Sequence, residues 1–217
     1  MTEKIVIIGA GGFGREVASM IKRINKLKAK WEFLGFFDDD ADGKPKGSKN
    51  EYGPILGTVS ELNNITEKMN VAIAVGSPKA VKAIVSKLDS PYLSFPNLIA
   101  AEASILDEDN YVMGKGNILS SFASISCNVH IGNFNIFNNR VSMGHDAVIG
   151  NYNVCMTAVR ISGGTVVGDG NLFGVSSIVI PGVKVLDGNT ISPGSVIMRN
   201  TKSNSTYVGN PAKLFKF

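Results

Sequence analysis

The strongest constraint on the fold is an apolar residue at every sixth position through the C-terminal half of the chain. The fifteen members of this series are all apolar: Met113, Leu119, Ile125, Ile131, Phe137, Met143, Ile149, Cys155, Ile161, Val167, Phe173, Val179, Val185, Ile191 and Ile197. Helical spacing cannot produce a period of six, whereas a solenoid whose coils each contain three short strands does. The sequence therefore predicts stacked parallel strands, with the aliphatic residue pointing into a narrow core.

Two other positions of the repeat favour small residues. The position four after the aliphatic residue is mostly small or Asn, as at Asn117 and Asn135. The position directly after it is often Gly, as at Gly114 and Gly144. We expect Gly and Asn at the corners of the coils, where some φ angles are positive. From the repeat alone, a rigid spacer without chemistry stays an open alternative.

The first 98 residues follow a different pattern, in which short apolar runs alternate with helical periodicity. We expect strands at 4–8, 32–37 and 70–75, a helix over 15–27, a second helix from Pro78 to about Leu88, and a loop over 41–54. Alternating strands and helices are typical of a small parallel sheet with helices on its faces.

Gly9, Gly11 and Gly14 form G-x-G-x-x-G between the first strand and the first helix, and Asp38 ends the next strand. This is the outline of a dinucleotide-binding motif. About 98 residues are only enough for half of a full dinucleotide fold. The preferred interpretation is that backbone N–H groups at the helix N-terminus hold the diphosphate of another ligand, a sugar nucleotide. A purely structural turn also remains open.

Composition excludes several classes of function. The net charge of +4 and the pI near 9.0 come without a dense basic run interleaved with aromatics, which argues against a nucleic-acid partner. Cys127 and Cys155 are too few for a disulfide framework or a four-thiolate metal site, so we expect no metal. There is no apolar run of about 20 residues and no signal-peptide pattern. We expect a cytoplasmic protein without a membrane span.

His145, followed by Asp146, is the candidate general base. Imidazole suits proton transfer near neutral pH, and a carboxylate can fix its tautomer. Adjacent side chains in a strand point apart, so this pair requires a turn. We expect His130 to be a surface residue and Cys155 a buried small hydrophobe. Cys127 has no His or Asp near it in the sequence, which argues against a cysteine nucleophile.

Five segments resemble one family when they are taken in order: 9–17, 36–40, 73–78, 144–150 and 207–213. The chain resembles bacterial hexapeptide-repeat sugar acyltransferases, the relatives of the sialic acid O-acetyltransferase and of acetyltransferases acting on nucleotide-linked 4-amino-4,6-dideoxy sugars. The resemblance implies a left-handed parallel β-helix. It also implies a homotrimer, with an acyl-CoA lying between neighbouring β-helices.

The resemblance divides the chain into a nucleotide-sugar-binding α/β domain (1–98), a left-handed β-helix acyltransferase domain (99–200) and a C-terminal tail (201–217). It implies catalytic roles for His145 and Asp146. It implies substrate contacts at Gly11, Gly12, Phe13, Asp38, Asp39, Gly76 and Asn138, and coenzyme contacts at Val154, Gly163, Val175 and Pro193.

Two residues depart from the family pattern. Some relatives have His where this chain has Phe13, and a phenyl ring donates no hydrogen bond. Relatives often have His where this chain has Val154, and the change could alter the acyl group accepted or reduce activity. These departures bear on the identity of the sugar, the nucleotide and the acyl chain.

The expected activity is direct acyl transfer from acetyl-CoA, or another acyl-CoA, to the amine of a nucleotide-linked 4-amino-4,6-dideoxy sugar in glycan biosynthesis. His145 accepts the amine proton, and a backbone N–H near Gly163 stabilises the oxyanion. One alternative is O-acetylation of sialic acid or another sugar hydroxyl. An alternative of a different class is a non-catalytic scaffold that binds a sugar nucleotide.

Overall fold

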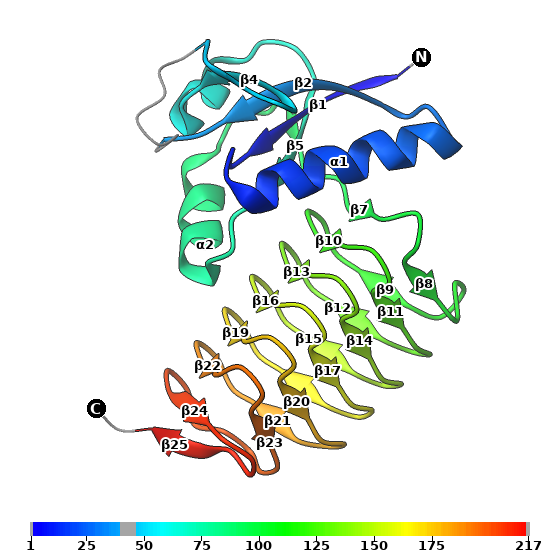
Figure 1. The fold of residues 1–217 in the computed structure, drawn as a ribbon, viewed down its shortest axis with the longest axis vertical. Coiled ribbons are helices and arrows are strands. Elements are labelled where there is room, and N and C mark those ends of the chain that lie inside the picture. Colours follow the sequence, from blue (N-terminus) through cyan, green and yellow to red (C-terminus); the bar gives the residue numbers. More distant parts are fainter. Residues whose placement is uncertain (1, 40–46, 216–217) are drawn as a thin grey trace.

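The computed structural model describes residues 2–39 and 47–215. Figure 1 shows an N-terminal region of helices and strands resting on a solenoid of stacked coils. The predicted order, an α/β region followed by a parallel β-helix of hexapeptide repeats, is confirmed. Asp40 and the loop residues 41–46 lie outside the described residues.

The N-terminal region contains a six-stranded sheet in the order β3-β4-β2-β1-β5-β6. Its elements are β1 (Glu3–Ile8), α1 (Gly12–Leu27), β2 (Trp31–Phe37), β3 (Lys49–Asn50), β4 (Gly53–Gly57), a 3-10 helix (Val59–Asn64), β5 (Met69–Ile73), α2 (Pro78–Lys87) and β6 (Leu93–Ser94). The predicted strands and helices are present. The prediction of a loop over 41–54 is wrong at its end, because β3 and β4 pair there as an antiparallel hairpin. Buried Ile55 anchors this hairpin, and β4 pairs with β2 in the sheet.

Three parallel sheets form the sides of the solenoid, and each full coil contributes one strand to each sheet. The first sheet contains β7 (Leu98–Ile99), β10 (Ile118–Leu119), β13 (Ile136–Phe137), β16 (Val154–Cys155), β19 (Leu172–Phe173) and β22 (Thr190–Ile191), extended by β24 (Thr206–Val208) and β25 (Lys213–Phe215). The second contains β8 (Ser104–Ile105), β11 (Ser124–Ile125), β14 (Ser142–Met143), β17 (Arg160–Ile161), β20 (Ile178–Val179) and β23 (Val196–Ile197). The third contains β9 (Val112–Met113), β12 (His130–Ile131), β15 (Val148–Ile149), β18 (Val166–Val167) and β21 (Lys184–Val185).

The predicted inward series forms the solenoid core. Every member except Met113 is buried, and each is the second residue of its strand. A ladder of buried asparagines lies beside this core: Asn117, Asn135, Asn153, Asn171 and Asn189. The backbone and side-chain N–H groups of Asn135 both donate to Oδ1 of Asn117, at 2.9 and 3.0 Å. Such pairing satisfies amides that would otherwise be costly to bury.

Residues with positive φ recur at the corners, at a position that the sequence pattern did not predict. Positive φ recurs at every sixth residue: Gly116, Phe122, Asn128, Phe134, Arg140, Asp146, Tyr152, Ala158, Gly164, Gly170, Ser176, Gly182, Gly188 and Gly194. Gly and Asn lie at the corners as expected, and the positive φ falls on a position between them. The asparagine ladder lies one residue later, and glycines such as Gly144 are needed because a Cβ there would lie 2.4 Å from the Gly163 nitrogen.

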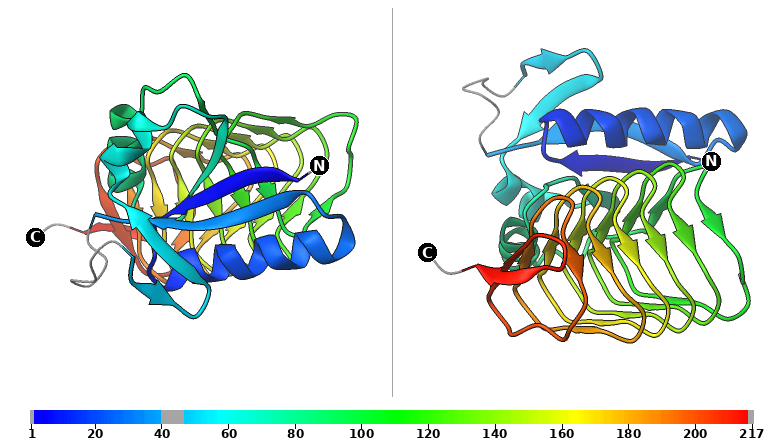
Figure 2. Two further views of the ribbon diagram at one scale, coloured as in Figure 1. Left: turned by 90° about the horizontal axis from the view of Figure 1, so that it is seen from above. Right: turned by 60° about the horizontal axis from the view of Figure 1, so that its bottom comes forward.

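The α/β region covers the outer face of the first solenoid sheet. Ile118, Ile136 and Val154 point outward from that sheet and are buried in clusters that they share with β1 and β5. In the right view of Figure 2 the α/β region lies above the solenoid. We call the turns between the first and second sheets the first corner, and those between the second and third sheets the second corner. In a three-sided coil the second corner is the edge farthest from the first sheet.

Within residues 2–39 and 47–215, no helix is long and apolar enough to cross a membrane.

Candidate active site

His145 and Asp146 follow β14 at the second corner, and their side chains converge. Asp146 has φ of 59°, which turns its carboxylate toward the preceding residue. His145 Nδ1 lies 2.8 Å from Asp146 Oδ2. With Nδ1 protonated, the ring donates to the carboxylate and leaves Nε2 as the basic atom. The His145 side chain is 70% exposed, so a substrate can reach it.

The second oxygen of the Asp146 carboxylate is also engaged. Asn128 Nδ2 donates to Asp146 Oδ1 at 2.8 Å from the preceding coil. The hydrogen bonds from His145 and then from Asn128 hold the pKa of Asp146 below its ordinary value of 3.8. The carboxylate is therefore ionised at neutral pH and accepts from both partners.

Three residues occupy the same place at the second corner on successive coils: Cys127, His145 and Gly163. The register of the second sheet, Ser124 beside Ser142, sets this 18-residue spacing. The Asp146 N–H donates to the Cys127 carbonyl at 3.0 Å. Strands in a sheet lie about 4.8 Å apart, so Cys127 and His145 are neighbours. The sequence analysis found no His beside Cys127, but the stacking of coils places His145 one coil away. The period of three hexads, 18 residues, was the signal that could have predicted this neighbour.

Gly163 lies beneath the imidazole of His145. A Cβ at this position would lie 2.6 Å from His145 Nε2, so the ring occupies space that only glycine leaves free. Within the described residues, the Gly163 N–H donates to no acceptor at hydrogen-bonding distance. It is therefore available to an oxyanion formed beside Nε2.

The glycine turn before α1 contains glycines of two kinds. Gly9 has φ of +101°, and a Cβ on Gly14 would lie 1.9 Å from the Gly9 carbonyl oxygen. By contrast, a Cβ on Gly11 or Gly12 would meet nothing within 4 Å. The first turn of α1 has no acidic residue, and Gly11 supplies no side-chain cap. The helix N-terminus is thus open to an anion.

Asp38 and Asp39 follow β2 beside this turn and bind backbone N–H groups. Asp38 Oδ2 accepts from Ala10 N–H at 2.6 Å, and Asp39 Oδ1 accepts from Val59 N–H at 2.8 Å. Asp38 therefore shapes the glycine turn, and Asp39 fixes the start of the 3-10 helix. Both residues were predicted to contact substrate.

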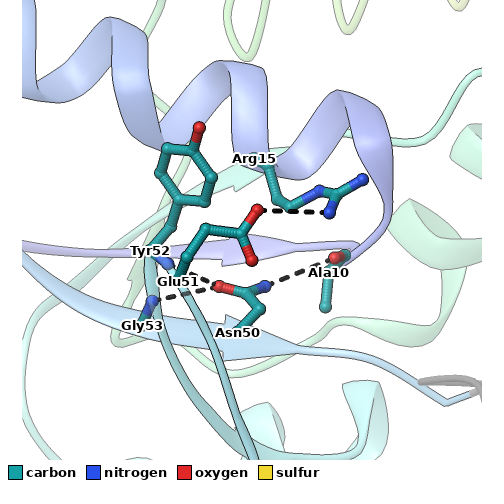
Figure 3. Close-up of polar contacts among 6 residues, drawn as sticks. All are labelled: Ala10, Arg15, Asn50, Glu51, Tyr52 and Gly53. Carbon is teal, nitrogen blue, oxygen red and sulfur yellow. Dashed lines mark hydrogen bonds and ion pairs between the residues drawn. The ribbon is translucent and has the colours of Figure 1, made fainter.

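The β3–β4 hairpin adds a second support to the turn that the sequence analysis missed. Figure 3 shows its tip against the start of α1. Asn50 Nδ2 donates to the Ala10 carbonyl at 3.5 Å, and Oδ1 of the same residue accepts from Tyr52 N–H. Glu51 pairs with Arg15 of α1 at 3.3 Å. The polar residues of β3 and of the turn that follows it favoured the prediction of a loop, because this part of the hairpin is held by hydrogen bonds and an ion pair.

Phe13, Gly76 and Asn138 lie where the two regions meet. Phe13 packs against both clusters of the α/β core and lines a cavity of about 260 Å³ with Ser120, Ser121 and Asn139 of the first corner. A Cβ on Gly76 would lie 4.0 Å from Cε of Met156. Asn138 Nδ2 lies 3.7 Å from the sulfur of the same methionine. The buried Asn138 Oδ1 has no partner within the described residues.

The four predicted coenzyme contacts do not form one cluster in a single chain. Gly163 lies at the second corner with His145, whereas Val175 and Pro193 lie on successive coils at the first corner. Val175 is 47% exposed. Val154 is wrong as a side-chain contact, because it is fully buried between the first sheet and the α/β region. An apolar residue fits there because the neighbouring side chains are apolar.

The described residues thus form two separate groups. The glycine turn, the end of β2, Gly76 and Asn138 lie along the α/β region and the first corner. The His145–Asp146 pair and Gly163 lie at the second corner, on the far edge of the coil. The order β2-β1-β5 explains the first grouping, because the carboxyl ends of these strands meet at one edge.

Comparisons with known proteins agree with this architecture. The profile of the PglD N-terminal domain family matches residues 4–88. A search of curated protein sequences gave no significant match. The chain is similar to the acetyltransferase domain of PglB from Neisseria gonorrhoeae, with a TM-score of 0.87 and 25% identity over 99% of this chain and 100% of that chain. A second structure of that domain is in complex with acetyl coenzyme A.

Two further solved structures cover the whole fold. WeeI from Acinetobacter baumannii matches with a TM-score of 0.87 and 25% identity over 99% of this chain and 100% of that chain. PerB from Caulobacter crescentus, in complex with CoA and GDP-perosamine, matches with a TM-score of 0.67 and 18% identity over 100% of this chain and 99% of that chain. The similarity to PerB supports the fold alone.

Proposed function

We propose that this chain is a hexapeptide-repeat sugar acyltransferase, which transfers an acetyl or similar acyl group from coenzyme A to the amine of a nucleotide-linked 4-amino-4,6-dideoxy sugar. The observation that carries this proposal is the His145–Asp146 pair, with its 2.8 Å contact and its exposed ring above Gly163. The similarity to a domain solved with acetyl coenzyme A supports the acyl donor.

The open glycine turn supports a nucleotide diphosphate as the handle of the acceptor. Gly11 and Gly12 face empty space, so the fold itself does not require glycine there. Unpaired N–H groups and a helix N-terminus without acidic residues favour a phosphate. Asp38 and the β3–β4 hairpin hold the turn in place from behind.

The separation of the two groups supports an active site shared between copies of the chain. His145 lies on the edge of the coil farthest from the α/β region, so a sugar held by the Gly12 turn of one copy meets His145 of a neighbouring copy. Val175 and Pro193 at the first corner then lie near Gly163 of that neighbour, in the cleft that holds the coenzyme. This arrangement is typical of closed cyclic assemblies, and we propose a homotrimer.

The proposed chemistry is a direct transfer. The sugar amine attacks the thioester carbonyl, and His145 Nε2 accepts the proton that the nitrogen loses. The carbonyl oxygen becomes an oxyanion, which accepts a hydrogen bond from the Gly163 N–H. When the carbon–sulfur bond breaks, the proton on Nε2 passes to the departing thiolate. Asp146 stays ionised and stabilises the imidazolium while it exists.

The test is release of free thiol from acetyl-CoA with a panel of acceptors. The panel contains UDP-, GDP- and dTDP-linked 4-amino-4,6-dideoxy sugars, together with free and CMP-linked sialic acid. Turnover with one amino sugar supports the proposal and identifies its nucleotide. Turnover with sialic acid alone would replace N-acylation with O-acetylation. Silence with acetyl-CoA and with longer acyl-CoAs would indicate a binding scaffold.

His145→Asn tests the base assignment in the same assay. A general base of this kind supplies about 10²- to 10⁴-fold in rate, so the variant should lose that much in kcat. Affinity for the sugar nucleotide should persist, because the glycine turn proposed to hold the diphosphate is unchanged in this variant. A rate within a few-fold of wild type would exclude His145 as the base.

A further inference from the structure

We infer that Asn128 is a positioning residue for the proposed acyl transfer: from the coil before, it fixes the Asp146 carboxylate that orients the His145 ring. This inference rests on the proposed role of His145 as the base. Asn128 lies 17 residues before His145, and no motif in the sequence connects them. The contact exists because the register of the second sheet stacks residue 128 directly on residue 146.

The geometry forms a chain of two hydrogen bonds. Asn128 Nδ2 donates to Asp146 Oδ1 at 2.8 Å, and Asp146 Oδ2 lies 2.8 Å from His145 Nδ1. The Asp146 side chain is 57% exposed, so its own packing does not fix the carboxylate plane. With one oxygen held by Asn128, the other stays directed at Nδ1. The ring then keeps Nε2 unprotonated above Gly163.

The backbone at both residues favours this contact. Asn128 and Asp146 have φ of 54° and 59°, in the left-handed region that Asn and Asp tolerate better than most residues. Other corner positions carry Phe122, Arg140 or Tyr152 in the same conformation, so the fold does not itself require Asn at a corner. Within the described residues, the Asn128 amide makes one side-chain hydrogen bond, and Asp146 receives it.

The strands that flank this corner carry two further ionisable side chains, Arg160 of β17 and His130 of β12, and within the described residues neither forms a hydrogen bond or ion pair with His145 or Asp146. The preceding coil contributes Cys127 and Asn128, and the following coil contributes Gly163 and Gly164. The one ion pair formed by His145 within the described chain is with Asp146. A change at Asn128 therefore acts on His145 through the Asp146 carboxylate.

The first variant is Asn128→Gly, which removes the amide and relieves the positive φ. We expect kcat to fall about 5- to 20-fold, less than the ~10²- to 10⁴-fold contribution of the base itself. KM for the sugar nucleotide and the melting temperature should stay near wild type. The matched control is Asn204→Gly, because Asn204 has φ of 52° far along the chain from the pair. The control should leave kcat unchanged.

Asn128→Asp gives a second readout that a merely structural role would not produce. It replaces the donor with a carboxylate facing Asp146, and the added negative charge favours the imidazolium form of His145. The acid limb of the kcat/KM profile should move to higher pH. Asn128→Gly should not move it in that direction.

The tautomer of His145 can be observed directly, because the chain has two histidines. In wild type, ¹⁵N imidazole spectra should show Nδ1 protonated and Nε2 unprotonated. In Asn128→Gly, the His145 signals should shift toward a tautomer mixture while those of His130 stay fixed. Unchanged kcat, pH profile and spectra in both variants would overturn the inference.

The two proposals fail in different ways. If His145→Asn is nearly as active as wild type, His145 is not the base, and both the proposed mechanism and the positioning role of Asn128 are wrong. If His145→Asn is inactive but Asn128→Gly behaves as wild type, only the positioning role is wrong.

Discussion

Glycines serve different purposes in the two regions of this molecule. In the solenoid, a glycine that directly follows an aliphatic residue of the series lies against the next coil, as a Cβ on Gly150 would lie 2.2 Å from Oδ1 of Asp169. In the turn before α1, Gly11 and Gly12 face open space. These solenoid glycines are therefore required by packing, whereas Gly11 and Gly12 of the turn are not. Gly163 belongs to the solenoid, but the group packed against it is the imidazole of His145.

The largest expected effect tests whether the two regions of one site come from different copies. His145→Asn disables the solenoid half, and Gly12→Asp disables the turn by placing a carboxylate where phosphate binds. Each variant alone should be nearly inactive. Co-expressed with different tags and purified as a mixed trimer, they should recover about one third of wild-type activity, because only one of the three interfaces of a mixed trimer joins an intact turn to an intact His145.

The controls for this mixing experiment use homogeneous samples. Asp at the first turn of a helix stabilises it, so Gly12→Asp should melt no earlier than wild type. Mixing separately purified variants without exchange should give no activity. Absence of recovery in verified mixed trimers would place both halves of the site within one chain.

The next largest effect concerns the glycine beneath the imidazole. Gly163→Ala places a methyl group 2.6 Å from His145 Nε2 and displaces the ring from the oxyanion donor. We expect kcat to fall about 10²-fold, the scale of a lost oxyanion contact. The control is Gly182→Ala at the same corner of the next coil, where a Cβ meets nothing within 4 Å and the φ of +72° is close to the 62° that Ala158 already adopts. An equal loss of kcat in both variants would show that the substitutions act through folding and not through the imidazole.

A third comparison separates the two kinds of glycine within the turn. Gly12→Ala adds a methyl group to open space, so KM for the sugar nucleotide should rise about 5- to 10-fold with no loss of stability. Gly14→Ala drives a methyl group into the Gly9 carbonyl, so it should cost about 1–3 kcal/mol of unfolding free energy. Urea melts and initial rates measure the two effects. An unstable Gly12→Ala with normal KM would show that the turn is structural.

The same contrast explains what the sequence could predict. A six-residue period fixes which side chains enter the core, so the series from Leu119 to Ile197 was identified correctly. The corner conformation depends on backbone stacking rather than on residue type, so positive φ at Phe122 and Arg140 could not be predicted. The β3–β4 hairpin was missed because β3 and the residues between the two strands, Lys49–Tyr52, are polar.

Relations between coils were hidden for another reason. Residues that touch are 18 apart in sequence, as are Cys127 and His145, and no local motif connects them. Val154 was misplaced because the family pattern aligns positions along the chain, whereas burial depends on the packing of the α/β region onto the first sheet. The contact between His145 and Asp146 could be predicted because the two residues are adjacent in the sequence.

A smaller effect distinguishes the two cysteines. Cys127 is partly exposed and lies one coil from His145, whereas Cys155 is fully buried in the core, and burial raises the pKa of its thiol. N-ethylmaleimide should therefore modify Cys127 first and lower activity several-fold by crowding the imidazole. Coenzyme A should slow this reaction, and Cys127→Ser should abolish it. Inactivation that persists in Cys127→Ser would assign the effect to another group.

The smallest effect compares two exposed carboxylates, one in each region. Hydrogen bonds from His145 and Asn128 lower the pKa of Asp146, and a hydrogen bond from Lys4 lowers the pKa of Glu67. A lowered folded-state pKa gives stability that is fully present above the ordinary values of 3.8 and 4.5 and is lost as the pH falls through the lower folded values. Asp146→Asn and Glu67→Gln should each slightly flatten the acid side of the melting-temperature profile.

Only Asp146→Asn should also lower kcat, because Glu67 stabilises the surface of the sheet whereas Asp146 is proposed to orient the base. Equal kcat values in the two variants would show that the contact between Asp146 and His145 does not contribute to catalysis.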